Sequence, residues 1–126
     1  MNVDIDIDLS GENFDPVKVG KLCNVSFREI TKKGDWNPRL KRKYKNGYGT
    51  LSFSDTYISD SLIDKVVSEY GKIANIGEGK LGIEYKEIWL YVECLQNSFT
   101  VNTSHFVKLN KFFPDINITF IQEKGD

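Results

Sequence analysis

Three aspartates near the N-terminus alternate with apolar residues and form the first set that could do chemistry. On a strand, Asp4, Asp6 and Asp8 would point to one face at intervals of about 6.6–6.8 Å. Such a row can bind a basic protein by imitating phosphate spacing, hold a divalent cation, or serve only as a solvated strand face. An EF-hand is excluded, because Leu9 stands where that loop needs glycine. We therefore predict that the three aspartates bind a partner and hold no metal.

A second candidate set lies in the basic and aromatic stretch between residues 36 and 48. Its candidate partner-binding residues are Trp36, Arg39, Arg42 and Tyr44. Basic residues among aromatic ones can contact phosphates and stack on bases, and they also anchor many protein interfaces. A solvated loop, or an edge strand protected by lysines, has the same composition. The whole chain has 17 basic and 18 acidic residues, which argues against a general nucleic-acid binder.

Motifs typical of enzymes are missing or stand in the wrong context. His105 is the only histidine, and no serine or cysteine lies in a recognisable catalytic motif. Residues 77–82 match G-x-G-x-x-G, but they follow an expected helix and precede an expected strand, the reverse of a dinucleotide-binding turn. We interpret them as a flexible connection and expect no cofactor and no catalytic residue. An enzyme with a carboxylate site stays as an alternative, because sequence does not reveal which carboxylates pair in space.

The elements that position these residues alternate between strands and helices. Asp15-Pro16 and Ser59-Asp60 are typical helix starts, Thr103 or Ser104 is expected to cap a third helix, and Gly71 is a candidate helix stop. Apolar periodicity predicts helices over 15–24, 59–71 and 103–113, and strands over 3–9, 47–54, 83–95, 98–101 and 116–122. We therefore predict that residues 1–126 form a single α+β domain. Its one sheet should be mostly antiparallel or mixed, with four to five strands and about three helices packed on it.

The expected compartment follows from the lack of signal-peptide and membrane-spanning patterns in the sequence. The N-terminal residues lack the basic and apolar regions of a signal peptide, and no apolar run reaches the roughly 20 residues that span a bilayer. We therefore expect a cytoplasmic protein without a membrane partner, in which Cys23 and Cys94 are reduced and packed in the core. Exposed aromatic residues on an edge strand could support a dimer, so we expect a monomer or a weak homodimer.

Several short signals along the chain fit one bacterial family. They include Ser10-Gly11, Phe14-Asp15-Pro16, Lys33-Gly34, Thr50-Leu51-Ser52, Ser98–Val101 and Ile116–Ile118. Their order resembles the domain of unknown function four-two-seven-nine, whose small domains are similar to immunity proteins kept beside bacterial toxins. The resemblance implies a non-enzymatic binding protein that neutralises a cognate toxin by direct contact. The alternatives are a nucleic-acid-binding module using residues 36–48 and an enzyme with a carboxylate site.

Overall fold

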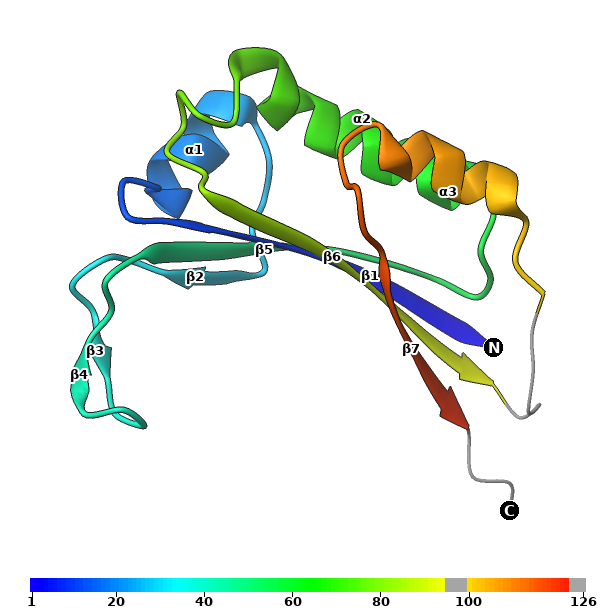
Figure 1. Ribbon diagram of the computed structural model, residues 1–126, viewed down its shortest axis with the longest axis horizontal. Coiled ribbons are helices and arrows are strands. Elements are labelled where there is room, and N and C mark those ends of the chain that lie inside the picture. Colours follow the sequence, from blue (N-terminus) through cyan, green and yellow to red (C-terminus); the bar gives the residue numbers. More distant parts are fainter. Residues whose placement is uncertain (95–99, 123–126) are drawn as a thin grey trace.

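A mixed five-stranded sheet forms one layer of the protein and three helices form the other (Figure 1). The computed structural model describes residues 1–94 and 100–122. Among the described strands the order is β2-β5-β1-β6-β7, in which β6 and β7 run parallel and the other neighbours run antiparallel. The strands are β1 (Asn2–Gly11), β2 (Glu29–Thr31), β5 (Gly47–Asp55), β6 (Tyr85–Cys94) and β7 (Asn117–Gln122). The predicted α+β class, with a mixed sheet and three helices, is confirmed.

A small hairpin extends from the sheet on the side opposite to the helices (Figure 1). Its strands, β3 (Trp36–Asn37) and β4 (Arg42–Lys43), pair with each other and form a separate two-stranded sheet. Asn37 is buried, and its side-chain oxygen accepts the N–H groups of Arg39 (3.1 Å) and Leu40 (3.2 Å). These hydrogen bonds hold the turn that joins the two strands. The basic and aromatic stretch between residues 36 and 48 therefore contains an exposed hairpin.

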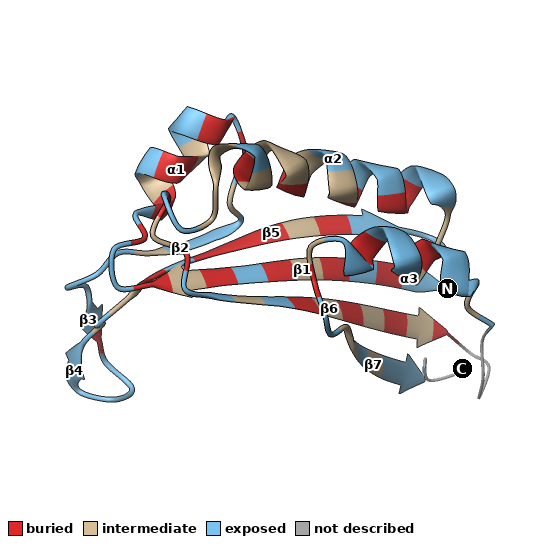
Figure 2. Ribbon diagram, turned by 45° about the horizontal axis from the view of Figure 1, so that its top comes forward, coloured by how far each residue is buried: buried red, intermediate tan, exposed pale blue. Residues whose placement is uncertain are grey.

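The helix-covered face of the sheet is apolar along its whole central strand (Figure 2). In β1, Val3, Ile5 and Ile7 are 0% exposed. This is the expected result of a two-residue period, which sends alternate side chains to opposite faces. Burying each such side chain stabilises the fold by about 1.5–3 kcal/mol. The same alternation places the aspartates of β1 on the other face.

The first helix, α1 (Pro16–Cys23), begins as predicted. Asp15 is its N-cap and accepts the N–H groups of Val17 (3.1 Å) and Lys18 (3.2 Å). The helix ends at Asn24, whose φ of 54° and ψ of 50° are left-handed, a conformation that asparagine tolerates. Cys23 is buried, as is Cys94 in β6, so the predicted core packing of both cysteines is confirmed.

The second helix, α2 (Asp60–Ile76), is longer than predicted. Ser59 caps its start by accepting the Leu62 N–H at 3.1 Å, but the helix continues past Gly71. The predicted stop is wrong because apolar positions continue on the core side, where Ile73 is 0% exposed. Burial of that side chain outweighs the cost of about 1 kcal/mol for glycine inside a helix. The helix ends at Gly77, whose φ is +115°.

The glycine-rich segment after α2 is tied to its surroundings by backbone contacts. The Glu84 N–H donates to Ser10 O at 2.9 Å, and the Ile83 N–H donates to Glu78 O at 3.0 Å. At Gly82, where φ is +79°, an added Cβ would lie 2.3 Å from Asn13 O. The glycine is therefore needed for a close approach of two backbones. This packing role gives a structural reason for the glycine at the end of the G-x-G-x-x-G pattern.

The third helix, α3 (Thr103–Asn110), packs beside α2. Its N-cap is Asn102, which accepts the Ser104 N–H at 3.0 Å, so the predicted cap at Thr103 or Ser104 is wrong by one or two residues. His105 is buried, and its Nε2 lies 3.0 Å from Asp60 Oδ1 on α2. Of the predicted strand at 98–101, residues 98 and 99 lie outside the described residues, and 100 and 101 are not in a strand. In the described ranges, no helix is both long and apolar enough to cross a membrane.

Candidate functional site

The face of the sheet opposite to the helices carries polar side chains from the three neighbouring strands β5, β1 and β6. In the described part of the chain, no helix covers this face (Figure 1). The face, which we call the open face, contains three parallel rows contributed by neighbouring strands. Its central row is Asp4, Asp6 and Asp8 of β1. The structure therefore brings the three predicted aspartates together on one accessible surface.

A row of hydroxyl groups borders the aspartates on the β5 side. Ser54, Ser52 and Thr50 stand directly opposite Asp4, Asp6 and Asp8 in the antiparallel register. Each hydroxyl donates a hydrogen bond to the facing carboxylate, at 2.5, 2.7 and 2.8 Å respectively. Hydrogen bonds to a charged acceptor are the stronger kind. The hydroxyl row therefore fixes the orientation of the carboxylates without neutralising them.

An aromatic row borders the aspartates on the β6 side. Tyr91 stands opposite Asp4 and Trp89 stands opposite Asp6. The two rings are stacked, with centroids 6.2 Å apart and planes 14° from parallel. The Trp89 Nε1–H donates to Glu87 Oε2 at 2.9 Å, which holds the indole in place. Half-buried aromatic rings beside carboxylates form a surface on which a guanidinium group can both stack and pair.

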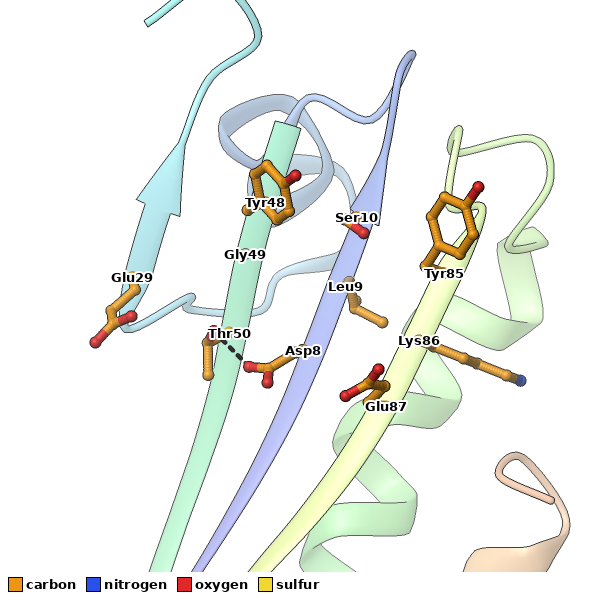
Figure 3. Close-up of a pocket in the computed structure, with 10 residues that line it drawn as sticks. All are labelled: Asp8, Leu9, Ser10, Glu29, Tyr48, Gly49, Thr50, Tyr85, Lys86 and Glu87. Atoms are coloured by element: carbon orange, nitrogen blue, oxygen red, sulfur yellow. Dashed lines mark hydrogen bonds between the residues drawn. The ribbon is translucent and has the colours of Figure 1, made fainter. Parts of the chain in front are cut away.

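A hollow of about 360 Å³ lies where the three rows meet one end of the sheet (Figure 3). Tyr48 of β5 and Tyr85 of β6 stand on its two sides, with Ser10 of β1 between them. The carboxylates of Asp8, Glu29 and Glu87 also line it. The hollow is therefore acidic at one end and aromatic at the other.

The carboxylates around this hollow repel one another. The pKa of Asp8 is raised above its usual range, first by partial withdrawal from water and then by the charges of Asp6, Glu87 and Glu29. The hydrogen bond from Thr50 opposes this rise but does not cancel it. The same carboxylates, Asp6 and Asp8, also help burial raise the pKa of the Tyr91 hydroxyl. A cationic group placed here would relieve this repulsion.

Arg28 is a cation that the structure places at this face. Its Nη2 lies 3.3 Å from Asp6 Oδ2 and 3.6 Å from Glu29 Oε1. The arginine side chain is 55% exposed, whereas that of Asp6 is only 15% exposed. Arg28 therefore shows in this chain how a guanidinium group sits beside the aspartate row. Among the described residues, no group of three or more His, Cys, Asp and Glu side chains could hold a metal ion.

The second predicted set lies apart from the aspartate row, on the β3–β4 hairpin. Trp36 is 60% exposed, and Arg39 and Arg42 are exposed as well. Tyr44 makes an edge-to-face contact with Tyr48, with ring centroids 5.7 Å apart. Because Tyr48 lines the hollow, this contact places the base of the hairpin beside the aromatic end of the hollow. The two predicted sets thus form neighbouring surfaces of opposite charge.

Sequence reasoning missed the residues that β6 contributes to the open face. They are Tyr85, Glu87, Trp89, Tyr91 and Glu93. They alternate with the buried residues Ile88, Leu90 and Val92, and this period of two was a usable signal. The alternation was difficult to recognise because tryptophan and tyrosine are common on either face of a sheet.

Comparisons of the chain with protein-family models, with curated proteins and with solved structures each found no match. The function is therefore inferred from the chemistry of the open face and the hairpin.

Proposed function

We propose that the protein is a non-enzymatic binding protein that receives a basic partner protein on the open face of its sheet. The observation that carries this proposal is the aspartate row, held between a hydroxyl row and an aromatic row. Carboxylates that are already oriented by hydrogen bonds lose little conformational entropy when a partner binds. The face is thus arranged to bind cationic side chains.

The aromatic row adds stacking and apolar contacts to the charge of the open face. Trp89 and Tyr91 are only partly buried, and their stacked rings lie next to Asp6 and Asp4. Tryptophan, tyrosine and arginine dominate the energetics of protein interfaces. An arginine of the partner can stack on a ring while pairing with the neighbouring aspartate. The carboxylates would speed association, and the aromatic contacts would slow dissociation.

The more specific form of the proposal is that the partner is a cognate bacterial toxin and that the protein acts as its cytoplasmic immunity protein. A toxin that acts on nucleic acid needs a basic surface to contact phosphates. A row of carboxylates at regular intervals can cover such a surface and block the toxin. Two observations support this more specific proposal: the acidic open face and the sequence resemblance described above.

The first test is binding to the protein encoded by the neighbouring gene, measured with purified proteins. The wild type should bind, and the triple variant Asp4→Asn/Asp6→Asn/Asp8→Asn should bind more weakly. Asp4 and Asp8 are the exposed members of the row, and Asp6 already pairs with Arg28. Each exposed ion pair contributes about 0.2–1 kcal/mol, so losing two should raise the dissociation constant about 2- to 30-fold. Asparagine still accepts the hydrogen bonds from the facing hydroxyl groups, which limits damage to the fold.

A matched control identifies which surface is used. The double variant Arg39→Gln/Arg42→Gln changes the hairpin and leaves the open face unchanged. It should bind the partner as the wild type does. Weaker binding by this variant, with full binding by the aspartate variant, would refute the open face as the binding surface.

Tryptophan fluorescence can test whether a basic partner contacts Trp89 on the open face. The chain has two tryptophans, Trp36 on the hairpin and Trp89 on the open face. In a Trp36→Phe background, the emission reports on Trp89 alone. A synthetic peptide that alternates arginine with threonine should change this emission, and the change should weaken as salt is raised. A signal that is unchanged at low salt would contradict stacking on Trp89.

The hairpin supports a second candidate function, the binding of nucleic acid. Trp36 is 60% exposed beside basic residues of the same hairpin, an arrangement that can stack on an unpaired base. This candidate predicts a gel shift with single-stranded RNA or DNA at low salt that Trp36→Ala and Arg42→Gln both weaken. Free migration of the nucleic acid at low salt would eliminate it.

A further inference from the structure

One row of side chains at the end of the open face alternates large and small residues. Ser10 of β1 stands directly opposite Tyr48 of β5 on one side and Tyr85 of β6 on the other. The two tyrosines therefore flank the hollow, with the serine between them (Figure 3). Tyr85 is 62% exposed, and Tyr48 is 41% exposed even though its ring also contacts that of Tyr44. Both rings thus present surface to a molecule that enters the hollow.

The spacing of the strands sets the width of this gap. Neighbouring strands lie about 4.8 Å apart, so the backbones that carry the two tyrosines, with β1 between them, are about 9–10 Å apart. A flat group that contacts an aromatic ring on each of its sides needs about 7–8 Å between the rings. The small side chain of Ser10 leaves this space open. One flat group therefore fits between Tyr48 and Tyr85.

An acidic row crosses the sheet next to the two tyrosines. Asp8 of β1 stands opposite Glu87 of β6, and both carboxylates line the hollow. Side chains two residues apart on a strand are about 6.6–6.8 Å apart, so these carboxylates are within reach of a group held between the rings. The Thr50 hydroxyl donates to Oδ1 of Asp8, and the Trp89 Nε1–H donates to Oε2 of Glu87. In the described part of the chain, the other oxygen of each carboxylate accepts no hydrogen bond and joins no ion pair.

The basic residue among those that line the hollow, Lys86, is turned away from it. Its Nζ lies 2.9 Å from Glu78 Oε2 and 5.3 Å from the centre of the Phe113 ring. In Figure 3, the Lys86 side chain extends away from Asp8 and Glu87. The pKa of Asp8 is raised, first by partial burial and then by the surrounding carboxylates, as expected where their charges are not balanced. Charge complementarity therefore favours a cation from outside the chain.

Arg28 shows which kind of cation this face accepts. Its guanidinium group lies 3.3 Å from Asp6 Oδ2 and 3.6 Å from Glu29 Oε1. Glu29 also lines the hollow, so this guanidinium group lies at its border. The carboxylates of Asp8 and Glu87 have no such partner among the described residues. A second guanidinium group can therefore pair with them without displacing Arg28.

We propose that the hollow receives one arginine side chain of the basic partner, with its guanidinium group between Tyr48 and Tyr85. The N–H groups of this arginine point to the oxygens of Asp8 and Glu87 that have no partner within the chain. The inference rests on the proposed function, because it names the group of the partner that occupies this part of the open face.

Arginine suits this place better than lysine. The guanidinium group is flat, carries five N–H donors and stacks on aromatic rings, whereas the ammonium group of lysine is compact and strongly hydrated. A flat cation between two rings contacts both, and it can also form two parallel hydrogen bonds to one carboxylate. We therefore expect a guanidinium ligand to bind about two- to fivefold more tightly than an ammonium ligand of similar length.

The first experiment uses small cations, so that it does not depend on the partner. Nα-acetyl-arginine amide is titrated into the isotope-labelled full chain, and the backbone amide signals are followed by NMR. The signals of Ser10 and Gly49, which line the hollow, should shift, whereas those of Val3 and Asp55 at the far end of the same strands should not. The dissociation constant should be on the order of millimolar, because a single side chain makes few contacts. Nα-acetyl-lysine amide should bind more weakly, and the uncharged Nα-acetyl-citrulline amide should not bind measurably.

A matched pair of double variants tests the residues. Tyr85→Leu/Glu87→Gln removes one ring and one charge from the hollow, and it should weaken binding of the arginine amide about 3- to 30-fold. Glutamine at this position still accepts the hydrogen bond from Trp89, which limits damage to the fold. Tyr57→Leu/Glu93→Gln removes the same two groups at positions outside the hollow, so it should bind the arginine amide as the wild type does.

Several results would overturn the proposal. They are an unchanged spectrum at about 20 mM arginine amide, well above the expected dissociation constant, equally tight binding of the lysine amide, and an equal loss of binding in both double variants. Shifts that centre on Asp4 and Asp6, with none at Ser10 and Gly49, would place the cation elsewhere on the open face and would also overturn it.

Binding of the intact partner separates this inference from the proposed function. Weaker binding of the partner by Tyr85→Leu/Glu87→Gln than by Tyr57→Leu/Glu93→Gln would support both. If the partner binds both double variants as tightly as the wild type, but binds the triple aspartate variant more weakly, the open face stands and the arginine pocket is refuted. If the arginine amide binds in the hollow but the protein encoded by the neighbouring gene does not bind, the guanidinium pocket stands and that partner is refuted.

Discussion

Two glycine-to-alanine substitutions should change stability in opposite directions. At Gly82, φ is +79°, and an added Cβ would lie 2.3 Å from Asn13 O and 2.8 Å from Phe14 N. A left-handed conformation costs an L-residue about 1–2 kcal/mol, and forcing the backbones apart adds about 1–3 kcal/mol. We expect Gly82→Ala to lower the free energy of unfolding by about 2–5 kcal/mol. This is a large part of the roughly 5–15 kcal/mol that keeps a domain folded.

The comparison position is Gly71, inside α2. Apart from its chain neighbours and the backbone of its own helix, no described atom lies within 4 Å of the place where its Cβ would be. Alanine loses less backbone entropy than glycine when a helix forms, so Gly71→Ala should raise the free energy of unfolding by about 0.5–1 kcal/mol. Gly79 lies in the same glycine-rich segment as Gly82 but also has open space around its Cβ position. Gly79→Ala should therefore change stability by less than about 0.5 kcal/mol.

The assay is urea unfolding followed by circular dichroism, with all variants at one protein concentration. A loss at Gly82, a gain at Gly71 and no change at Gly79 would support close backbone approach as the reason for the glycine at 82. A Gly82→Ala protein as stable as the wild type would refute this reasoning. Equal losses at Gly79 and Gly82 would show that the segment depends on its glycines for a different reason.

Two further substitutions test the electrostatics of the fold. Asp8→Asn should raise the free energy of unfolding at about pH 7 but not at about pH 3, as urea unfolding at the two pH values would show. The sign follows because the pKa of Asp8 is raised in the folded state, which means that folding disfavours the ionised carboxylate. This penalty is absent at low pH and grows as the pH rises towards the raised pKa. An equal effect of the substitution at both pH values would contradict this reasoning. Tyr70→Phe should lower the free energy of unfolding by about 1.5–3 kcal/mol, because the buried Tyr70 hydroxyl donates to Glu78, which also pairs with Lys86 at 2.9 Å. Thermal unfolding that matches the wild type would show that this hydrogen bond contributes nothing.

The local patterns in the sequence predicted most of the fold. The alternation in residues 3–9 was sufficient to place the aspartates and the core residues of β1 on opposite faces. The caps at Asp15 and Ser59 were predicted because capping depends on neighbouring residues only. The stop at Gly71 was wrong because the burial of Ile73 against the sheet is a long-range effect. Local signals thus fixed where elements begin, and packing decided where α2 ends.

The candidate site was predictable only in part. Asp4, Asp6 and Asp8 share a strand, so their common face followed from the sequence alone. Their facing hydroxyl and aromatic rows depend on the register of β5 and β6, whose facing residues lie about 40 to 50 and about 80 to 90 residues further along the chain. A single sequence gives no distance between such segments. The contact between Tyr44 and Tyr48 joins residues only four positions apart, but it depends on how the chain turns from β4 into β5, and so it was not foreseen.

The central position of β1 has a consequence for the protein while it is being made. Both strands that flank β1 come later in the chain, and β6 ends only at Cys94. At a synthesis rate of about 5–20 residues per second, β1 therefore waits for several seconds before its second neighbour exists. During that time β1 is an exposed segment rich in valine, isoleucine and leucine, and such segments can assemble with the same segment of other nascent chains. The aspartates between them oppose such aggregation, because charged residues flanking apolar ones disfavour intermolecular strand pairing. The aspartate row therefore protects the nascent chain before the open face has formed.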